Sequence, residues 1–290
     1  MNWNNIGFVI CKPDAVYLNL EQEILSFLRE KGFEILACKY VTITPDLCRL
    51  LYWKGDDHVT GWWWELEAEF FNLGESLCIL VQGTTSPPYR SVSELIDQKI
   101  KGNNKPEYAK SGTIRRKFGA MNRIFNLFHS SDCTKAAKRE APLFFTDEEF
   151  ESLANENVSC ILKQNENTTL DITDTYFRMK LHCIRVSSMN SNAKQEYLYY
   201  INEKHRQSRS VSNTKKQMWL YETLQEENRL FYMDIYENKL LKAITDYRYF
   251  KKIDYDALFK VFSKSGVKLT KWERCLLKTT MILLSKNYRV

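Results

Sequence analysis

Short apolar runs alternate with helical patterns through the first 150 residues, and this alternation constrains the fold more than any other feature. Runs typical of buried strands cover residues 7–11, 33–41 and 76–82, and a fourth leads into His129. Helical spacing falls between them, at residues 19–31, 44–52, 62–71 and 92–100, with Thr44 as a cap and Pro45 at the first helical position. A β-α-β-α-β-α-β order with short connections predicts an α/β or α+β domain, one sheet with helices on a face.

The fourth run carries the most informative stretch, Asn126-Leu127-Phe128-His129-Ser130-Ser131-Asp132. A strand that ends in polar residues delivers a side chain into a cleft, and Asp132 is a candidate N-cap for the next helix. Imidazole titrates near neutrality, so an uncharged nitrogen is available as a nucleophile or proton carrier. Glu140 lies eleven residues further on, where it can reach back and orient the ring. The alternative for a lone histidine is a satisfied position in a core.

Composition excludes several classes of protein. The chain has 290 residues, 44% of them hydrophobic and 27% charged, which suits one large or two modest globular domains. No apolar run reaches the ~18 residues of a membrane span, and the first five residues do not resemble a signal peptide. The eight cysteines are scattered without C-x-x-C spacing, which indicates buried free thiols, no zinc site and a cytoplasmic location.

Charge divides the chain into two parts. Residues 1–150 hold 18 basic and 20 acidic side chains, whereas residues 151–290 hold 24 and 16. This asymmetry predicts two units with different partners. We place their boundary at residue 153, with a first domain at residues 1–153 and a basic, mainly helical domain at residues 154–290.

The second part predicts structure more weakly. Residues 156–169 are typical of a linker or exposed hairpin, and residues 176–186 alternate in a way that predicts a strand with a wet, basic face. Residues 203–216 predict a mobile basic loop, and helical patterns follow at residues 217–249, 254–264 and 271–287, the last capped by Thr270. The basic loop permits an anionic acceptor or partner, and the alternative is a merely solvated surface. Its cations are Lys204, Arg206, Arg209, Lys215 and Lys216.

Four motifs in the first part occur together in one order. They are Lys12-Pro13-Asp14, Gly112-Thr113-Ile114-Arg115, Asn126-x-x-His129-x-Ser131-Asp132 and Glu140. In order and approximate spacing the chain resembles the nucleoside diphosphate kinases over about residues 5–150. The resemblance implies an α+β fold with a ferredoxin-like βαββαβ antiparallel sheet. It also implies nucleotide substrates, Mg²⁺, and ping-pong transfer of a γ-phosphate through a phosphohistidine.

The resemblance also assigns roles to residues. His129 resembles the phosphorylated histidine, and Glu140 and Ser131 the pair that hold its ring. Lys12 resembles the lysine near the γ-phosphate and ribose, and Tyr52 the tyrosine beside the histidine, although a packing role is the alternative for Tyr52. Arg115 resembles a phosphate-binding arginine and Asn126 the asparagine that meets the sugar. Asn104 stands where the family has a phosphate-contacting threonine. We identify no metal-binding residue in the chain itself.

Some positions depart from the family pattern. Gln98 stands where the family has a second phosphate-binding arginine, and Lys99, Lys101 or Arg116 can substitute for it. The family's aromatic residue that stacks on the base is not recognisable here, and the three tryptophans at residues 62–64 are the candidates. Ser130 stands where the family has a glycine after the histidine. The alternatives to an ordinary kinase are therefore a nucleotide-binding regulatory module that turns over poorly, or a kinase retuned to a specialised non-nucleotide acceptor. Assembly into a homo-oligomer is a further possibility that the sequence leaves open.

Overall fold

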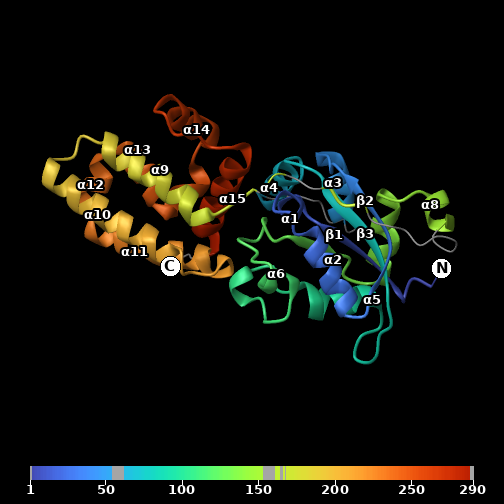
Figure 1. The fold of residues 1–290 in the computed structure, drawn as a ribbon. Helices are drawn as coiled ribbons and strands as arrows, with labels where there is room; N and C mark the ends of the chain where they lie inside the picture. The colour runs from blue at the N-terminus through green and yellow to red at the C-terminus, as the bar shows by residue number, and fades with distance from the viewer. Residues whose placement is uncertain (1, 54–61, 153–160, 164–165, 167, 288–290) are drawn as a thin grey trace. The chain divides into compact units, whose positions relative to one another are not determined.

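The computed structural model describes residues 2–53, 62–152, 161–163, 166 and 168–287. The chain divides into two compact units (Figure 1). The first comprises Met1–Ala120 and Ile124–Thr169, and the second comprises Met121–Arg123 and Leu170–Val290. The boundary predicted at residue 153, and most of the linker predicted at residues 156–169, lie outside the described residues.

The first unit is built on one antiparallel sheet. Its strands are β1 (Ile6–Cys11), β2 (Glu34–Val41), β3 (Ser76–Gln82) and β4 (Phe128–Ser130), in the order β2-β3-β1-β4. All three pairings are antiparallel, and Ile10 of β1 lies opposite His129 of β4. The unbroken apolar sequence of β1 matches its position, because every residue in it is buried. The sheet confirms the predicted α+β class and its ferredoxin-like strand order.

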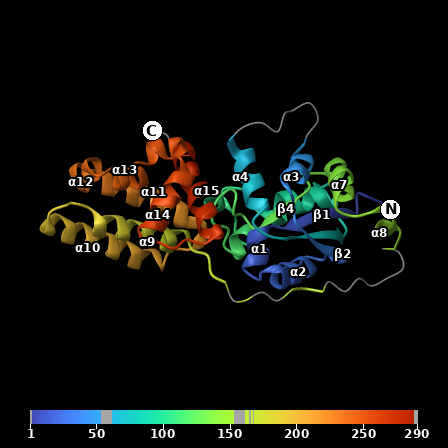
Figure 2. The same cartoon turned by 90° about the horizontal axis from the view of Figure 1, so that it is seen from above.

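Helices cover both faces of this sheet. Val9, Ile79 and Val81 share a core with α2 (Glu21–Glu30) and with α5 (Val92–Leu95), which continues as the π-helix η1 (Ile96–Lys101). Figure 2 shows α3 (Pro45–Tyr52) and α4 (Trp62–Phe71) on the side of the sheet opposite to α2. The remaining elements are α1 (Pro13–Tyr17), η2 (Pro106–Tyr108), α6 (Ile114–Lys117), α7 (Thr134–Glu140), η3 (Ala141–Leu143) and α8 (Asp147–Ser152).

The predicted caps have different outcomes. Thr44 caps α3, since its hydroxyl accepts the Leu47 N–H at 3.3 Å. The prediction for Asp132 is wrong, because Cys133 is the N-cap of α7 and makes no capping hydrogen bond through its side chain.

The second unit is mainly helical, as predicted. It contains α9 (Ile172–Val186), α10 (Ser191–Ser208), α11 (Asn213–Leu230), α12 (Tyr232–Glu237), α13 (Lys239–Thr245), η4 (Tyr247–Lys252), α14 (Tyr255–Lys264) and α15 (Lys271–Asn287). The strand predicted at residues 176–186 is wrong, because these residues belong to α9. Lys180, predicted to face water, is fully buried beside Tyr176 and Phe177. An apparent alternation misleads when a helix is buried on several sides.

The mobile basic loop predicted at residues 203–216 is wrong as well. This segment is the end of α10, a short connection and the start of α11. Three of its five cations form ion pairs, Lys204 with Glu226 at 2.6 Å, Arg206 with Glu203 at 2.6 Å, and Lys216 with Asp171. Polar composition suggested a loop, but these internal ion pairs and the helical spacing determine the structure.

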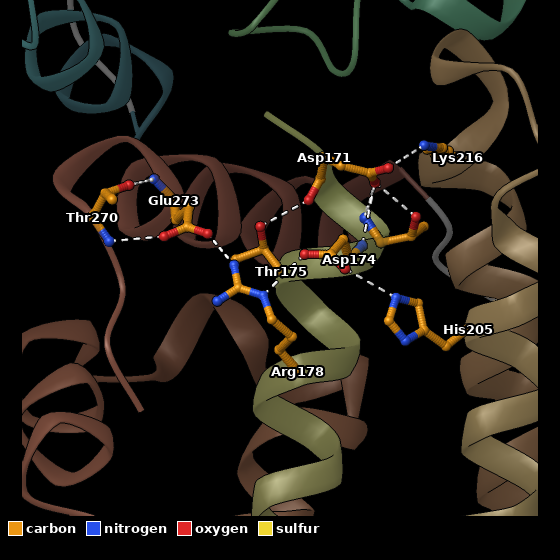
Figure 3. Close-up of polar contacts among 9 residues, drawn as sticks. Asp171, Asp174, Thr175, Arg178, His205, Lys216, Thr270 and Glu273 are labelled. Carbon is orange, nitrogen blue, oxygen red and sulfur yellow. Dashed lines mark hydrogen bonds and ion pairs between the residues drawn. The ribbon is translucent and has the colours of Figure 1, made fainter. Parts of the chain in front are cut away.

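A polar network joins several helices of the second unit (Figure 3). Asp171 caps α9 by accepting the N–H groups of Thr173 and Asp174, and it also pairs with Lys216 of α11. Asp174 lies 3.1 Å from His205 Nε2 of α10, a histidine for which the sequence suggests no partner. Arg178 pairs with Glu273 of α15, and the predicted Thr270 cap is present in a reciprocal form.

The described cysteines only partly match the prediction of buried free thiols. Cys11, Cys48, Cys78, Cys183 and Cys275 are buried and free. Cys133 is free but exposed, and Cys38 is disulfide-bonded, so the prediction is wrong at both. Scattered spacing in the sequence does not say which thiols meet in space. Within the described ranges, no helix has the length and apolar character needed to cross a membrane.

Candidate active site

The site is organised by an unusual turn just before β4. Leu127 is buried with φ of 70°, a conformation that a bulky residue rarely adopts. Asp14 holds it there, because its carboxylate accepts the Leu127 N–H at 3.0 Å and the Ala15 N–H at 3.1 Å. The Leu127 carbonyl accepts the Lys12 N–H at 2.9 Å. This turn fixes Asn126 and His129 on either side of it.

The buried Asp14 has an electrostatic consequence. Burial raises the pKa of its carboxyl to about 6, although Lys12 and the hydrogen bond from Leu127 act in the opposite direction. The sequence motif Lys12-Pro13-Asp14 contains this residue, but no role for Asp14 followed from the motif. Its role in the structure is to position the turn.

Among the described residues, His129 is hydrogen-bonded through one ring nitrogen. Its Nε2 lies 2.9 Å from Glu140 Oε2, and the Ser131 hydroxyl donates to the same oxygen at 2.8 Å. Arg139 donates to the other carboxylate oxygen, Oε1, at 2.6 Å. A carboxylate accepts hydrogen bonds, so Nε2 carries the proton and the Nδ1 lone pair is left available. The predicted trio of His129, Ser131 and Glu140 is therefore brought together.

Tyr52 lies beside this trio. Its ring meets the His129 ring edge to face, with 5.7 Å between the centroids and 84° between the planes. Burial, and next the Glu67 carboxylate, raise the pKa of its phenol well above the usual range, so Tyr52 is neutral. Among the predicted tryptophans, Trp63 packs against Tyr52 at 5.8 Å and Trp64 against Arg49. The side chain of Trp62 lies outside the described residues.

Lys12 is buried and has three hydrogen-bond acceptors. Its ammonium donates to the Ile124 carbonyl at 2.8 Å, to Glu67 Oε2 at 3.1 Å and to Asn126 Oδ1 at 3.3 Å. An ammonium has three N–H donors, so these contacts use all of them. The ammonium also lies over the Phe70 and Phe71 rings. A phosphate that binds Lys12 must displace one of these acceptors.

Glu67 is the functional candidate that the sequence motifs missed. It lies on α4 with a side chain 9% exposed, and it forms a buried ion pair with Lys12. Its charge reaches further, since it is among the causes that shift the pKa values of Tyr52, Cys48 and Arg115. The only sequence signal was the middle one of three glutamates, Glu65, Glu67 and Glu69, which alternate with apolar residues in the helix Trp62–Phe71. Such a residue is easily interpreted as exposed.

Arg115 is held by backbone carbonyl oxygens. Its Nη2 donates to Phe128 at 2.8 Å, Nη1 to Gly102 at 3.1 Å and Nε to Asn126 at 3.3 Å. Residue 102 must be glycine for this loop conformation, because its φ is 95° and a Cβ there would lie 2.6 Å from the Thr113 hydroxyl. Burial lowers the pKa of the guanidinium to about 10, which leaves it charged at neutral pH. Two of its five N–H donors have no partner in these contacts.

A lysine stands near the position of the missing arginine. Gln98 donates to Glu94 at 3.2 Å along its own helix and is exposed, so it does not replace a guanidinium. Lys101 is paired with Asp97, and its pKa is lowered by burial and next by the Arg115 charge. The positive charge of Arg115 therefore acts on Lys101. Lys101 is thus partly buried and subject to the Arg115 charge, whereas Lys99 is exposed.

Asn104 does not join this group of contacts. It is exposed in the segment between η1 and η2, and it makes no hydrogen bond to the described site residues. Lys99 is exposed as well. The role predicted for Asn104 from the spacing of the motifs therefore has no contact that supports it in this structure.

Comparison with known proteins matches these residues to one family. The chain matches the nucleoside diphosphate kinase family over residues 5–150. A nucleoside diphosphate kinase from Sulfurisphaera tokodaii is 33% identical over 142 residues, 49% of this chain and 89% of that protein. Another, from Methanobrevibacter smithii, is 34% identical over 143 residues, 49% of this chain and 88% of that protein. This chain belongs to the nucleoside diphosphate kinase family.

The resemblance inferred from the motifs is thus confirmed. Among solved structures, a nucleoside diphosphate kinase family protein from Babesia bovis is 28% identical, with a TM-score of 0.43, covering 50% of this chain and 90% of that one. Membership of the family makes the chain a phosphotransferase. The family match ends at residue 150, so it leaves residues 151–290 without an assignment.

Proposed function

We propose that the protein moves the γ-phosphate of a nucleoside triphosphate to a diphosphate acceptor through a phosphohistidine at His129. The observation that carries this proposal is the one-sided anchoring of the ring. Glu140 Oε2 holds Nε2 at 2.9 Å, so Nδ1 is the nitrogen with a free lone pair.

The reaction proceeds in two balanced steps. In the first, Nδ1 forms a bond to the γ-phosphorus, the bond from that phosphorus to the bridging oxygen breaks, and the nucleoside diphosphate leaves. Phosphorylation at Nδ1 places positive charge on the ring, and the Glu140 carboxylate compensates for it. In the second step the acceptor's terminal phosphate oxygen attacks the phosphorus, and the N–P bond breaks. The proton on Nε2 stays in its hydrogen bond throughout.

Cationic groups of the site suit the phosphates. Phosphoryl transfer mainly requires positioning and positive charge near the equatorial oxygens. Lys12, Arg115 and Lys101 supply that charge, and Asn126, next to Lys12, suits a sugar hydroxyl. Mg²⁺ enters bound to the nucleotide phosphates, as part of the substrate. Tyr52 orients the His129 ring by its edge-to-face contact.

One observation favours a second candidate, a kinase-like nucleotide-binding module that turns over poorly. Glu67 forms an ion pair with Lys12. Its buried negative charge therefore lies beside the ammonium group that the phosphates must reach. A third candidate, a kinase retuned to a non-nucleotide acceptor, fits the same carboxylate. We favour the ordinary transfer because His129 and Ser131 both contact the same oxygen of Glu140.

The setting of the reaction is also a proposal. We place the protein in the cytoplasm, where nucleoside triphosphates are supplied, and the kinase unit can act within a homo-oligomer. We assign the binding of an anionic acceptor or partner to the second unit. Arg209 and Lys215 are the cations of its basic segment that form no ion pair with a described residue.

A transfer assay tests this function. The full-length protein is incubated with γ-labelled ATP, Mg²⁺ and a second nucleoside diphosphate, and label in the new triphosphate is measured. We expect transfer with parallel double-reciprocal lines, and none with His129→Gln, which keeps a polar side chain without the nucleophile. Transfer at an undiminished rate in the variant contradicts the proposal. Tight nucleotide binding without transfer in the wild type supports the regulatory module.

A further inference from the structure

The second unit contains a pocket that the kinase function does not use. Its volume is about 310 Å³, and it lies where α11, α12 and η4 meet. Three tyrosines and two arginines line it, namely Tyr232, Tyr236, Tyr247, Arg229 and Arg248. The volume is at the lower end of the range for small-molecule sites.

Arg248 is fixed in place before any ligand arrives. Its Nε donates to Asp246 Oδ1 at 2.7 Å and its Nη2 to Oδ2 at 2.9 Å, and Nη2 also donates to the Tyr236 hydroxyl. Asp246 is buried, whereas the Arg248 side chain is 59% exposed. Nη1 makes no hydrogen bond to a residue that the structure describes. A guanidinium held in this way loses little conformational entropy when it binds an anion.

The pocket also offers a second cation and an aromatic surface. Arg229 is exposed and forms no ion pair within the described part of the chain. The Tyr232 and Tyr236 rings stack with 4.4 Å between their centroids and 25° between their planes, and Tyr232 is 54% exposed. Aromatic side chains beside arginines bind flat, anionic ligands by stacking and charge together.

Asn228 supplies an unpaired acceptor in the same pocket. Its Nδ2 donates to the carbonyl oxygens of Leu224 at 2.8 Å and Thr245 at 3.1 Å. A flip of the amide would bring Oδ1 against these two carbonyl oxygens, so the orientation is fixed. Its Oδ1 is therefore the free atom, and it is buried without a hydrogen-bond partner among the described residues. A buried acceptor without a partner is unfavourable, and a ligand with an N–H donor relieves it only when the wall of the pocket opens at Asn228.

We propose that this pocket binds a nucleoside phosphate. The base stacks on the tyrosine pair, and Arg229 and Arg248 take the phosphate. Inorganic phosphate can bind the two arginines but makes no use of the tyrosines. The source of the nucleotide is either free nucleotide or the end of a single strand, since both present the same groups. This site is distinct from the one around His129 and does not depend on phosphoryl transfer.

Photolabelling of the full-length protein with radioactive 8-azido-ADP separates the two sites, because labelled peptides are mapped by mass spectrometry. We expect label in the peptide that holds residues 225–248 as well as in the kinase unit. Arg229→Glu and Tyr232→Ala change exposed side chains, and each should lower label in this peptide about tenfold without lowering it in the kinase unit. Arg185→Glu is the matched control, since Arg185 is also exposed but lies on α9 and does not line the pocket.

Three outcomes overturn the proposal. They are no label at residues 225–248, label there that neither variant lowers, and inorganic phosphate competing as well as ADP. Competition by a single-stranded oligonucleotide at lower concentration than ADP assigns the nucleotide to a strand end. Weaker competition by the oligonucleotide assigns it to free nucleotide.

Discussion

Each unit buries one lysine against a glutamate, and the two pairs differ in their surroundings. Lys12 and Glu67 in the kinase unit are 2% and 9% exposed, and their neighbours include Tyr52 and Asn126. Lys180 and Glu227 in the helical unit are both fully buried. Burying two charges is unfavourable unless hydrogen bonds complete the pair. The Lys12–Glu67 pair is therefore one that a substrate can separate, whereas the Lys180–Glu227 pair is enclosed by the fold.

The enclosed pair links four helices. Lys180 of α9 donates to Glu227 of α11 at 2.6 Å and to Thr245 of α13, and Tyr197 of α10 donates to the same glutamate. None of these groups lines the pocket described in the helical unit. The pair of the kinase unit instead holds the cation that phosphates must reach. Identical residue types therefore serve stability in one unit and substrate binding in the other.

Replacing each lysine by methionine gives the largest difference. Lys180→Met leaves Glu227 as a fully buried charge without its partner, and we expect the helical unit to lose about 3–5 kcal/mol of stability. Lys12→Met should cost the kinase unit less, about 1–3 kcal/mol, because Glu67 is closer to water, but it should abolish most transfer. Hydrogen exchange of α9 and α11 against β1 and β3 measures each unit separately. Equal losses in the two units would break the comparison.

Asp14 should make the kinase unit respond to pH in a way that the helical unit does not. Burial raises the pKa of this carboxyl from 3.8 to about 6, so the folded state binds the proton more tightly than the unfolded state. The resulting stability is fully present below pH 4 and is lost as pH rises to 6, by up to about 3 kcal/mol.

Asp14→Asn removes this titration. The stability of wild type minus that of the variant, followed between pH 4 and pH 7, isolates the contribution of Asp14 from other groups. We expect this difference to fall as pH rises and then to level off above pH 6. A flat difference would mean that Asp14 is not shifted in the folded protein.

Glu67→Gln should have the smallest effect, and it sharpens the comparison most. Glutamine keeps the size and one acceptor for Lys12 but removes the charge that competes with phosphates. We expect KM for the nucleoside triphosphate to fall about threefold to tenfold, with a smaller change in kcat. Glu65→Gln, on the exposed side of the same helix, is the control. A higher KM in Glu67→Gln would show that the carboxylate assists binding.

The sequence predicted the parts of the site that lie at the ends of strands. His129, Ser131, Asn126 and Lys12 are close in sequence to β1 or β4, so strand patterns and motifs place them together. Glu67 escaped prediction because its partner is 55 residues away and an ion pair leaves no periodic signal. The Leu127 turn escaped for a similar reason, since nothing about a leucine indicates a positive φ.

The helical unit shows where pattern reasoning fails. Helices with a capping residue and one clear apolar face, such as α14 and α15, were predicted close to their bounds. α9 was mistaken for a strand because it is buried around much of its surface and includes Lys180. The sequence of the end of α10 predicted a loop because it is polar and basic, whereas Lys204 is paired with Glu226 of α11 and Arg206 with Glu203 of its own helix.

Direct detection of the phosphoenzyme tests the central claim. Full-length wild type and His129→Gln are incubated with γ-labelled ATP and Mg²⁺, freed of nucleotide, and then mixed with an unlabelled nucleoside diphosphate. We predict acid-labile, alkali-stable label on the wild type only, mapped to His129 and transferred fully to the diphosphate on mixing. Equal labelling of the variant, or label on the wild type that the diphosphate cannot remove, would contradict the account.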